Sequence, residues 1–126
     1  MKLIQDPTRF DVMLMENLYG DLVSDMCAGL VGGLGVTPGA NIGDDAAVFE
    51  AVHGSAPDIA GKGVANPLAL IMSGVMMLNH IHEEKIAEKI KAAYDAVLGE
   101  GKTLTRDLGG TAGTNDFADA VIGKMK

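Results

Sequence analysis

The segment that decides how this chain is interpreted reads His53-Gly54-Ser55-Ala56-Pro57-Asp58-Ile59-Ala60-Gly61-Lys62-Gly63-Val64-Ala65-Asn66-Pro67. The apolar run at 47–52 precedes it and predicts a strand. Open α/β sheets bind ligands in loops at the carboxyl ends of their strands. The small residues after His53 would let backbone amides approach such a ligand closely. The commoner alternative is a Gly/Pro-rich surface connection without a ligand.

Apolar residues at helical spacing predict four helices, over 18–30, 68–81, 84–98 and 115–125. The second of these is apolar on nearly all sides, so we expect it to be buried. The first helix is expected to end at Gly32-Gly33. The helix from 68 is expected to start after Asn66-Pro67, and the last helix is expected to be capped by Thr114. The run at 10–15 predicts a strand buried on both faces, as in a parallel sheet. Pro38-Gly39 is expected to mark a turn.

Composition limits the classes of protein that fit. The chain has 126 residues, 48% hydrophobic and 21% charged, which fits one globular domain or less. Its net charge of −7 argues against nucleic acid or an anionic membrane as a partner. Cys27 is the single cysteine, which fits a reducing compartment, the cytoplasm or an organelle matrix. No leader segment is expected, and the longest apolar run, 68–78, is too short to cross a bilayer.

Asp21 and Asp25 are the first candidate site residues. They stand four apart in the predicted helix 18–30, so their carboxylates share one face. Hard divalent cations take carboxylate oxygens as ligands, and binding one would relieve the repulsion between the two charges. The alternative is a solvated polar face. Two carboxylates do not complete a Mg²⁺ or Mn²⁺ shell, so other oxygens would have to finish it.

Asp58 is the second candidate. A carboxylate there could accept hydrogen bonds from the ribose diol of NAD, and its charge would repel the 2′-phosphate of NADP. The alternative is a turn-forming aspartate after Pro57.

These motifs together resemble the C-terminal part of the isocitrate/isopropylmalate dehydrogenase family, metal-dependent oxidative decarboxylases. The similarity covers essentially the whole chain. It rests on several segments in the family's order: Asn17-Leu18-Tyr19-Gly20-Asp21-Leu22-Val23-Ser24-Asp25, Gly32-Gly33-Leu34-Gly35, Pro38-Gly39-Ala40-Asn41-Ile42-Gly43, Phe49 to Gly61 and Ala65-Asn66-Pro67.

The resemblance implies a role for each matching residue. Asp21 and Asp25 match the family's metal-binding aspartates, which hold Mg²⁺ or Mn²⁺. The loop around the adenosine half of the cofactor is matched by His53, Gly54, Ser55, Ala56 and Pro57. Asn66 matches the adenine contact, Asp58-Ile59 match the NAD-using members, and Asp107 is assigned to the same cofactor site. The implied cofactor is therefore NAD.

The implied fold is a three-layer α/β/α sandwich of the α/β class. Residues 1–33 would end a small domain that carries the metal site and forms a two-fold dimer. Residues 34–126 would be the C-terminal half of the large cofactor domain. Leu22, Met26 and Leu30 then become interface candidates, the alternative being core within one chain.

The implied substrate is an isocitrate-like 2-hydroxy acid, with isocitrate converted to 2-oxoglutarate. Pro38-Gly39-Ala40-Asn41 and Glu50-Ala51-Val52 favour isocitrate over 3-isopropylmalate or homoisocitrate, but they discriminate weakly. A non-catalytic chain that binds nucleotide or docks to a partner, like the regulatory subunits of some relatives, is the alternative of another class.

The family's substrate-binding arginines, catalytic Tyr and Lys, and third metal-binding Asp have no match in these residues. We therefore expect no sustained NADH production when the 126-residue chain alone is given isocitrate, NAD and Mn²⁺. The measurement is absorbance of NADH over time, and continued turnover would refute the expectation.

Overall fold

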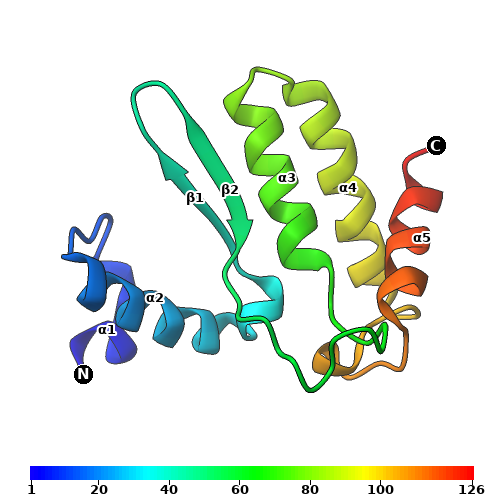
Figure 1. The fold of residues 1–126 in the computed structure, drawn as a ribbon, viewed down its shortest axis with the longest axis horizontal. Helices are drawn as coiled ribbons and strands as arrows, with labels where there is room; N and C mark the ends of the chain where they lie inside the picture. The colour runs from blue at the N-terminus through cyan, green and yellow to red at the C-terminus, as the bar shows by residue number, and fades with distance from the viewer.

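The structure is a computed structural model that describes all of residues 1–126. Its helices are α1 (Lys2–Gln5), α2 (Asn17–Val31), α3 (Leu68–His80), α4 (Glu84–Glu100) and α5 (Thr114–Lys124). Its two strands are β1 (Pro38–Ile42) and β2 (Ala47–Ala51), and its 3₁₀ helices are η1 (Pro7–Arg9), η2 (Leu34–Val36) and η3 (Arg106–Leu108). Helices plus one small sheet fit the predicted α/β class (Figure 1).

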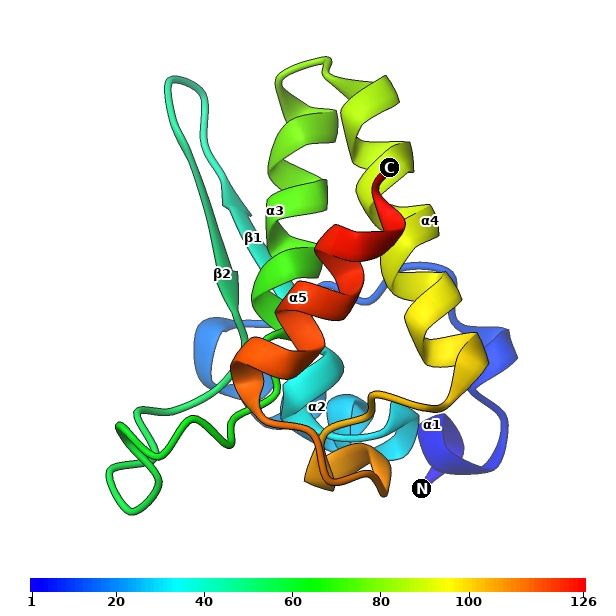
Figure 2. The same cartoon turned by 90° about the vertical axis from the view of Figure 1, so that its right-hand side faces the viewer.

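The core lies between α3, α4 and α5, which stand side by side in Figures 1 and 2. Eight buried side chains from these three helices form one cluster: Leu68, Val75, Ala87, Ala93, Tyr94, Val97, Phe117 and Val121. Burial excludes water from the Tyr94 phenol and raises its pKa. At the rim, Lys124 of α5 pairs with Glu100 of α4 and lowers the pKa of that carboxyl. The contribution of this ion pair is lost as the pH falls through the lowered pKa.

The two strands form an antiparallel hairpin that leans on α3 (Figure 1). Ala47, Phe49 and Ala51 alternate with more exposed residues, as expected for a strand with one covered face. Ser73 of α3 joins the two elements, since its buried Oγ lies 2.7 Å from the Glu50 carbonyl oxygen and 2.9 Å from that of Ala69. Its single proton serves these two acceptors, so the hairpin is held by both packing and hydrogen bonding.

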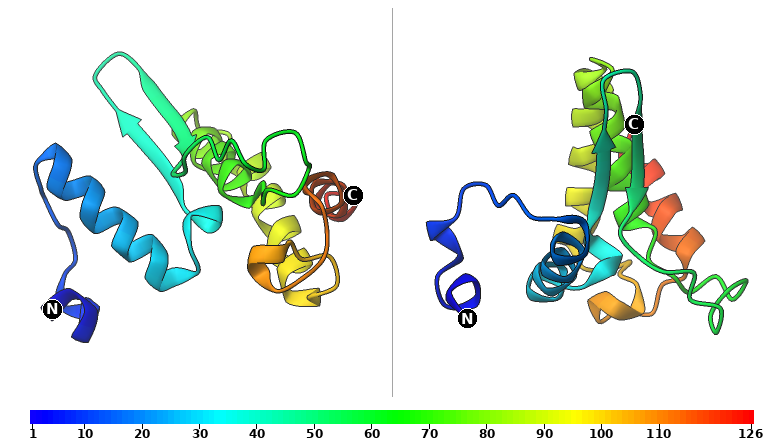
Figure 3. Two further views of the ribbon diagram at one scale, coloured as in Figure 1. Left: turned by 60° about the horizontal axis from the view of Figure 1, so that its bottom comes forward. Right: turned by 60° about the vertical axis from the view of Figure 1, so that its left-hand side comes forward.

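Helix α2 lies to one side of the α3–α5 core (Figure 3). Its main contact is with η2, which it reaches through a turn at Gly32 and Gly33. Those glycines have φ of +130° and +103°, which side chains with a Cβ rarely adopt, so the predicted glycine stop is confirmed. Ala28 is the one buried residue of α2, and Leu22 and Leu30 are 60% and 57% exposed.

Four predictions about local structure are wrong. Residues 10–15 form no strand, because no other segment of this chain pairs with them, and Val12 and Leu14 are almost fully exposed. Pro38-Gly39 begins β1 instead of a turn. Proline is tolerated at the first position of a strand, and a Cβ on Gly39 would lie 3.2 Å from the Glu50 carbonyl oxygen.

The third correction concerns α3, which is not buried all round. Leu68, Ala69, Ser73 and Val75 face the core, whereas Leu70 is 61% exposed. The helices predicted from periodicity are otherwise confirmed to within about two residues, with Gly113 instead of Thr114 as the α5 cap. None of the helices is long and apolar enough to cross a membrane.

Candidate functional site

The two longest irregular segments lie at the same end of the molecule, beside the first turn of α5 (Figure 2). One is the loop 53–67 between β2 and α3, and the other is the segment 101–113 between α4 and α5, which contains η3. Together with η2 they line an open cavity of about 1010 Å³. Its lining residues are Leu34, Gly35, His53, Gly54, Ser55, Ala56, Ile59, Ala60, Gly61, Gly63, Val64, Ala65, Asn66, Arg106, Asp107, Thr114 and Asn115.

The loop reverses direction through tight turns of its own backbone. Ile59 N–H donates to the Ala56 carbonyl and Lys62 N–H to the Ile59 carbonyl. Gly61 and Gly63 have φ of +74° and +63°, which explains the choice of glycine at both positions. Ala56, another lining residue, also has a positive φ, +40°. Backbone strain of this kind is often stored at functional sites.

The end of the loop is fastened to the start of α5. The backbone N–H of Thr114 donates to the Gly63 carbonyl at 2.8 Å, and the Thr114 hydroxyl donates to the Ala65 carbonyl at 2.5 Å. A Cβ on Gly113 would lie 2.9 Å from the same Gly63 oxygen, so only glycine allows this approach. The far wall of the cavity is therefore set by contacts between residues about fifty positions apart.

Asn66 makes the polar connection inside the cavity. Its Oδ1 accepts the N–H of Leu68 at 2.9 Å, which satisfies one free donor at the start of α3. Its Nδ2 donates to Oδ2 of Asp107 on η3 at 2.8 Å. Gly35 of η2 packs against this pair, and a Cβ there would lie 2.8 Å from Asp107 Oδ2. Three segments distant in sequence thus meet at one amide.

The structure gathers most of the predicted cofactor residues around this one cavity. Seven of them line it: His53, Gly54, Ser55, Ala56, Ile59, Asn66 and Asp107. Pro57 and Asp58 do not; they are exposed and stand in the loop between the lining residues Ala56 and Ile59. The assignment of the Asp58 carboxylate to a ribose diol stays a prediction.

Sequence reasoning missed part of the wall. Leu34 and Gly35 of η2 line the cavity, as do Arg106, Thr114 and Asn115. Gly35, the third glycine of Gly32-Gly33-Leu34-Gly35, is a signal for close approach of another segment, but nothing local indicates which segment approaches. Arg106 is the one cationic residue of the lining, and Asp107 is the one anionic residue.

Asp21 and Asp25 lie on the continuous helix α2, four residues apart, and both are exposed. Their carboxylates form no ion pair within the chain. Oxygen donors on one helix face suit Mg²⁺ or Mn²⁺ in type. No group of three or more His, Cys, Asp or Glu side chains gathers as a metal site in this chain, so the pair supplies part of a coordination shell only.

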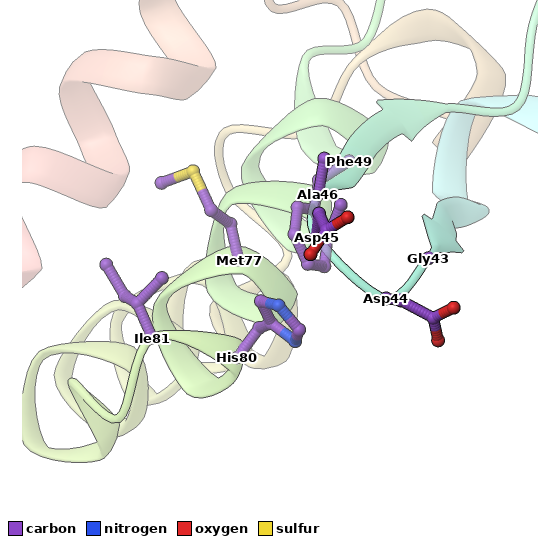
Figure 4. A pocket seen from close by; sticks show the side chains of 9 residues that line it. Gly43, Asp44, Asp45, Ala46, Phe49, Met77, His80 and Ile81 are labelled. Atoms are coloured by element: carbon purple, nitrogen blue, oxygen red, sulfur yellow. The ribbon is translucent and has the colours of Figure 1, made fainter.

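A second cavity, of about 470 Å³, lies between the hairpin turn and the end of α3 (Figure 4). Its lining includes Asp44 and Asp45 of the turn with Phe49, Met77 and His80. The Phe49 and His80 rings pack at 5.4 Å between centroids. None of the residues predicted to bind metal or cofactor lies there, so the larger cavity is the candidate site.

A family model described as isocitrate/isopropylmalate dehydrogenase matches residues 1–121. The chain belongs to this family. That membership agrees with the resemblance seen in the motifs, and it accounts for the loop, the aspartate pair and the asparagine occurring in one order.

Individual family members are closely similar. Over 127 residues the chain is 54% identical to the mitochondrial isocitrate dehydrogenase [NAD] subunit alpha of Homo sapiens, covering all of this chain and 35% of that protein. It is 58% identical over 122 residues to catalytic subunit 6 of the mitochondrial isocitrate dehydrogenase [NAD] of Arabidopsis thaliana, covering 96% and 33%. The crystal structure of isocitrate dehydrogenase from Methylococcus capsulatus superposes with a TM-score of 0.93 at 52% identity, covering 99% and 38%.

Two conclusions follow from these similarities. The predicted fold type, the C-terminal part of the isocitrate/isopropylmalate dehydrogenase sandwich, is confirmed by the superposition. The chain spans about a third of the length of these relatives.

Thr105 directly precedes η3, the 3₁₀ helix that carries Asp107. The fully buried Oγ1 of Thr105 has no hydrogen-bond partner. Valine has the same shape without the hydroxyl, so Thr105→Val removes an unsatisfied polar group. We expect the variant to keep or gain stability, by up to about 1 kcal/mol in urea unfolding. Thr105→Ser, which keeps the hydroxyl and loses a buried methyl, is the matched control and should lose about 1 kcal/mol. A valine variant less stable than the serine variant would contradict this account.

Proposed function

We propose that this chain is the C-terminal, cofactor-binding part of an NAD-dependent and Mg²⁺- or Mn²⁺-dependent oxidative decarboxylase. Its most fitting substrate is isocitrate, which would be converted to 2-oxoglutarate. The observation that carries the proposal is the cavity beside the loop 53–67, around which seven of the predicted cofactor residues gather. The names of the relatives, NAD isocitrate dehydrogenases, support the same substrate and cofactor.

The chemistry of the cavity supports binding over catalysis. Ser55 has no base hydrogen-bonded to its hydroxyl, and the His53 Nδ1 faces the carbonyl oxygen of its neighbour Gly54 at 3.0 Å. A nucleophile activated by an adjacent base is therefore absent from this wall. Small lining residues and the two side-chain amides of Asn66 and Asn115 leave room for a flat base and a sugar, which suits the adenosine half of NAD.

The preference for NAD over NADP is assigned to Asp58. Its carboxylate lies on the loop beside the cavity, between Ala56 and Ile59, and Arg106 is the single cation of the lining. A 2′-phosphate would place roughly two further negative charges next to Asp58, and like charges at short range repel. The ribose of NAD carries no such charge.

Asp21 and Asp25 are proposed to hold the divalent ion, with the substrate, water or another carboxylate completing the shell. A bound Mg²⁺ or Mn²⁺ supplies Lewis-acid stabilisation of negative charge on substrate oxygens. The two side chains hold and orient the ion on the α2 face, where neither is engaged in another ion pair.

Further assignments belong to the same proposal. Residues 1–33 end the small domain, and residues 34–126 are the C-terminal half of the large one. The exposed Leu22 and Leu30 of α2 favour a two-fold homo-oligomer through that helix. The mitochondrial relatives favour an organelle matrix over the cytoplasm. A 3-isopropylmalate or homoisocitrate dehydrogenase and a non-catalytic, nucleotide-binding subunit are the competing functions.

The cofactor assignment predicts that the chain binds NAD more tightly than NADP in titration calorimetry. Asp58→Asn keeps the shape of the side chain and removes its charge, so NADP binding should improve by about tenfold while NAD binding changes little. Asp119→Asn, an exposed aspartate on α5, is the control. Tighter binding of NADP by the unmodified chain would overturn the assignment.

The metal assignment predicts measurable heat when Mn²⁺ is titrated into the chain, and the loss of that heat in Asp21→Asn and in Asp25→Asn. Each substitution replaces one of two carboxylates by a neutral amide and leaves a single anionic ligand, which binds a hard cation weakly in water. Asp119→Asn again serves as the control. Binding unaffected by either α2 substitution would place the ion elsewhere, and retained Mn²⁺ binding favours the catalytic over the non-catalytic function.

A further inference from the structure

We propose that Asp107 and Gly35 fix the side-chain amide of Asn66 in one orientation, and that this orientation makes the cavity select adenine over hypoxanthine. The inference rests on the proposed function, because it takes the adenosine half of NAD to be the ligand. Asp107 of η3 and Gly35 of η2 thereby have a positioning role, although they are far apart in the sequence.

The orientation of the Asn66 amide is determined by two partners of opposite character. Leu68 presents a backbone N–H, which can only donate, at 2.9 Å from Oδ1. Asp107 presents an ionised carboxylate oxygen, which can only accept, at 2.8 Å from Nδ2. A rotation of the amide by 180° would set Oδ1 against the carboxylate and Nδ2 against the N–H. Both contacts would then be repulsive, so the second orientation is excluded.

The locked amide still has hydrogen-bonding capacity to offer. Nδ2 has two protons and Oδ1 has two lone pairs, and each partner uses one. One donor and one acceptor therefore remain, in fixed places, on a residue that lines the cavity. An asparagine amide can pair with adenine on the edge that carries N1, because the N6 amino group donates there and the neighbouring N1 accepts.

Deamination of the base inverts that pattern. Hypoxanthine has a carbonyl oxygen in place of the amino group, and its neighbouring N1 carries a proton. A free asparagine amide pairs with either base by rotating through 180°. An amide held by Leu68 and Asp107 cannot rotate, so it pairs with adenine and opposes hypoxanthine.

Gly35 leaves the space that the Asp107 carboxylate occupies when it accepts the Asn66 hydrogen bond. A Cβ at this position would lie 2.8 Å from Asp107 Oδ2 and 3.5 Å from the Asn66 Cβ. The φ of Gly35 lies outside the left-handed region, so alanine fits the backbone and the strain falls on the carboxylate alone. Gly35→Ala thus displaces the acceptor from Asn66 without altering either partner chemically.

The experiment measures binding of NAD and of nicotinamide hypoxanthine dinucleotide by calorimetry, with circular dichroism to verify folding. The unmodified chain should prefer NAD by about tenfold, the effect of one correct hydrogen-bonded pair. Asp107→Ala should reduce the preference to about threefold or less, chiefly by improved binding of the hypoxanthine analogue. Asp107→Asn keeps the size of the side chain, but its amide can turn to present either an oxygen or an NH₂ to Asn66, so it should lower the preference as the alanine variant does.

Gly35→Ala is the second variant and should lower the preference as Asp107→Ala does, even if the latter folds poorly. Gly29→Ala, on a part of α2 with no atom within 4 Å of the added methyl, is its control. A merely structural role would weaken both dinucleotides equally. That result, or an Asp107→Asn variant that keeps the full preference for NAD, would overturn the proposal.

The failure of this inference is distinguishable from failure of the proposed function. If the unmodified chain binds neither dinucleotide, the proposed function fails and the inference fails with it. If the unmodified chain binds both dinucleotides equally well, the function stands and the orientation lock alone is refuted.

Discussion

The side chain of Asn66 makes two hydrogen bonds on which the geometry of the cavity depends. In one of them Asn66 accepts the N–H of Leu68 at the start of α3. In the other it donates to Asp107 of η3, forty-one residues further along the chain. The hydrogen bonds from Thr114 to the carbonyls of Gly63 and Ala65 also stabilise the cavity, because they attach the loop to α5. Because the helices are fixed by their buried core, these few polar contacts are enough to hold a loop of small residues open toward solvent.

The packing of the chain is uneven, and the unevenness bears on function. The α3–α5 cluster is well buried, whereas α2 and the outer face of the hairpin expose large apolar side chains, among them Leu18, Ile42 and Val48. Apolar surface of that extent normally marks an interaction surface. Asp21 and Asp25, the proposed metal ligands, are exposed on this same helix, so a partner that covers α2 would also approach them.

Family membership and local geometry contribute different parts of the interpretation. Membership rests on a match to nearly the whole chain and indicates the kind of chemistry. The geometry identifies which residues meet: the amide, the η3 carboxylate and the η2 glycine form one contact group. Asp58, the residue on which the choice of NAD rests, is exposed beside the cavity and does not line it. Its proposed effect on binding is therefore the repulsion of a 2′-phosphate that approaches the loop.

The sequence by itself determined the helices, the strand predicted at 47–52 and found at 47–51, the glycine stop after α2 and the position of the loop 53–67. Each depends on periodicity or on local backbone preference, which neighbouring residues carry. Only the tertiary structure decided that residues 10–15 form no strand, that Pro38-Gly39 pairs with β2, and that Gly35, Asn66 and Asp107 meet. Strand pairing and contacts between distant segments depend on which surfaces come together, and no local pattern encodes the identity of the partner.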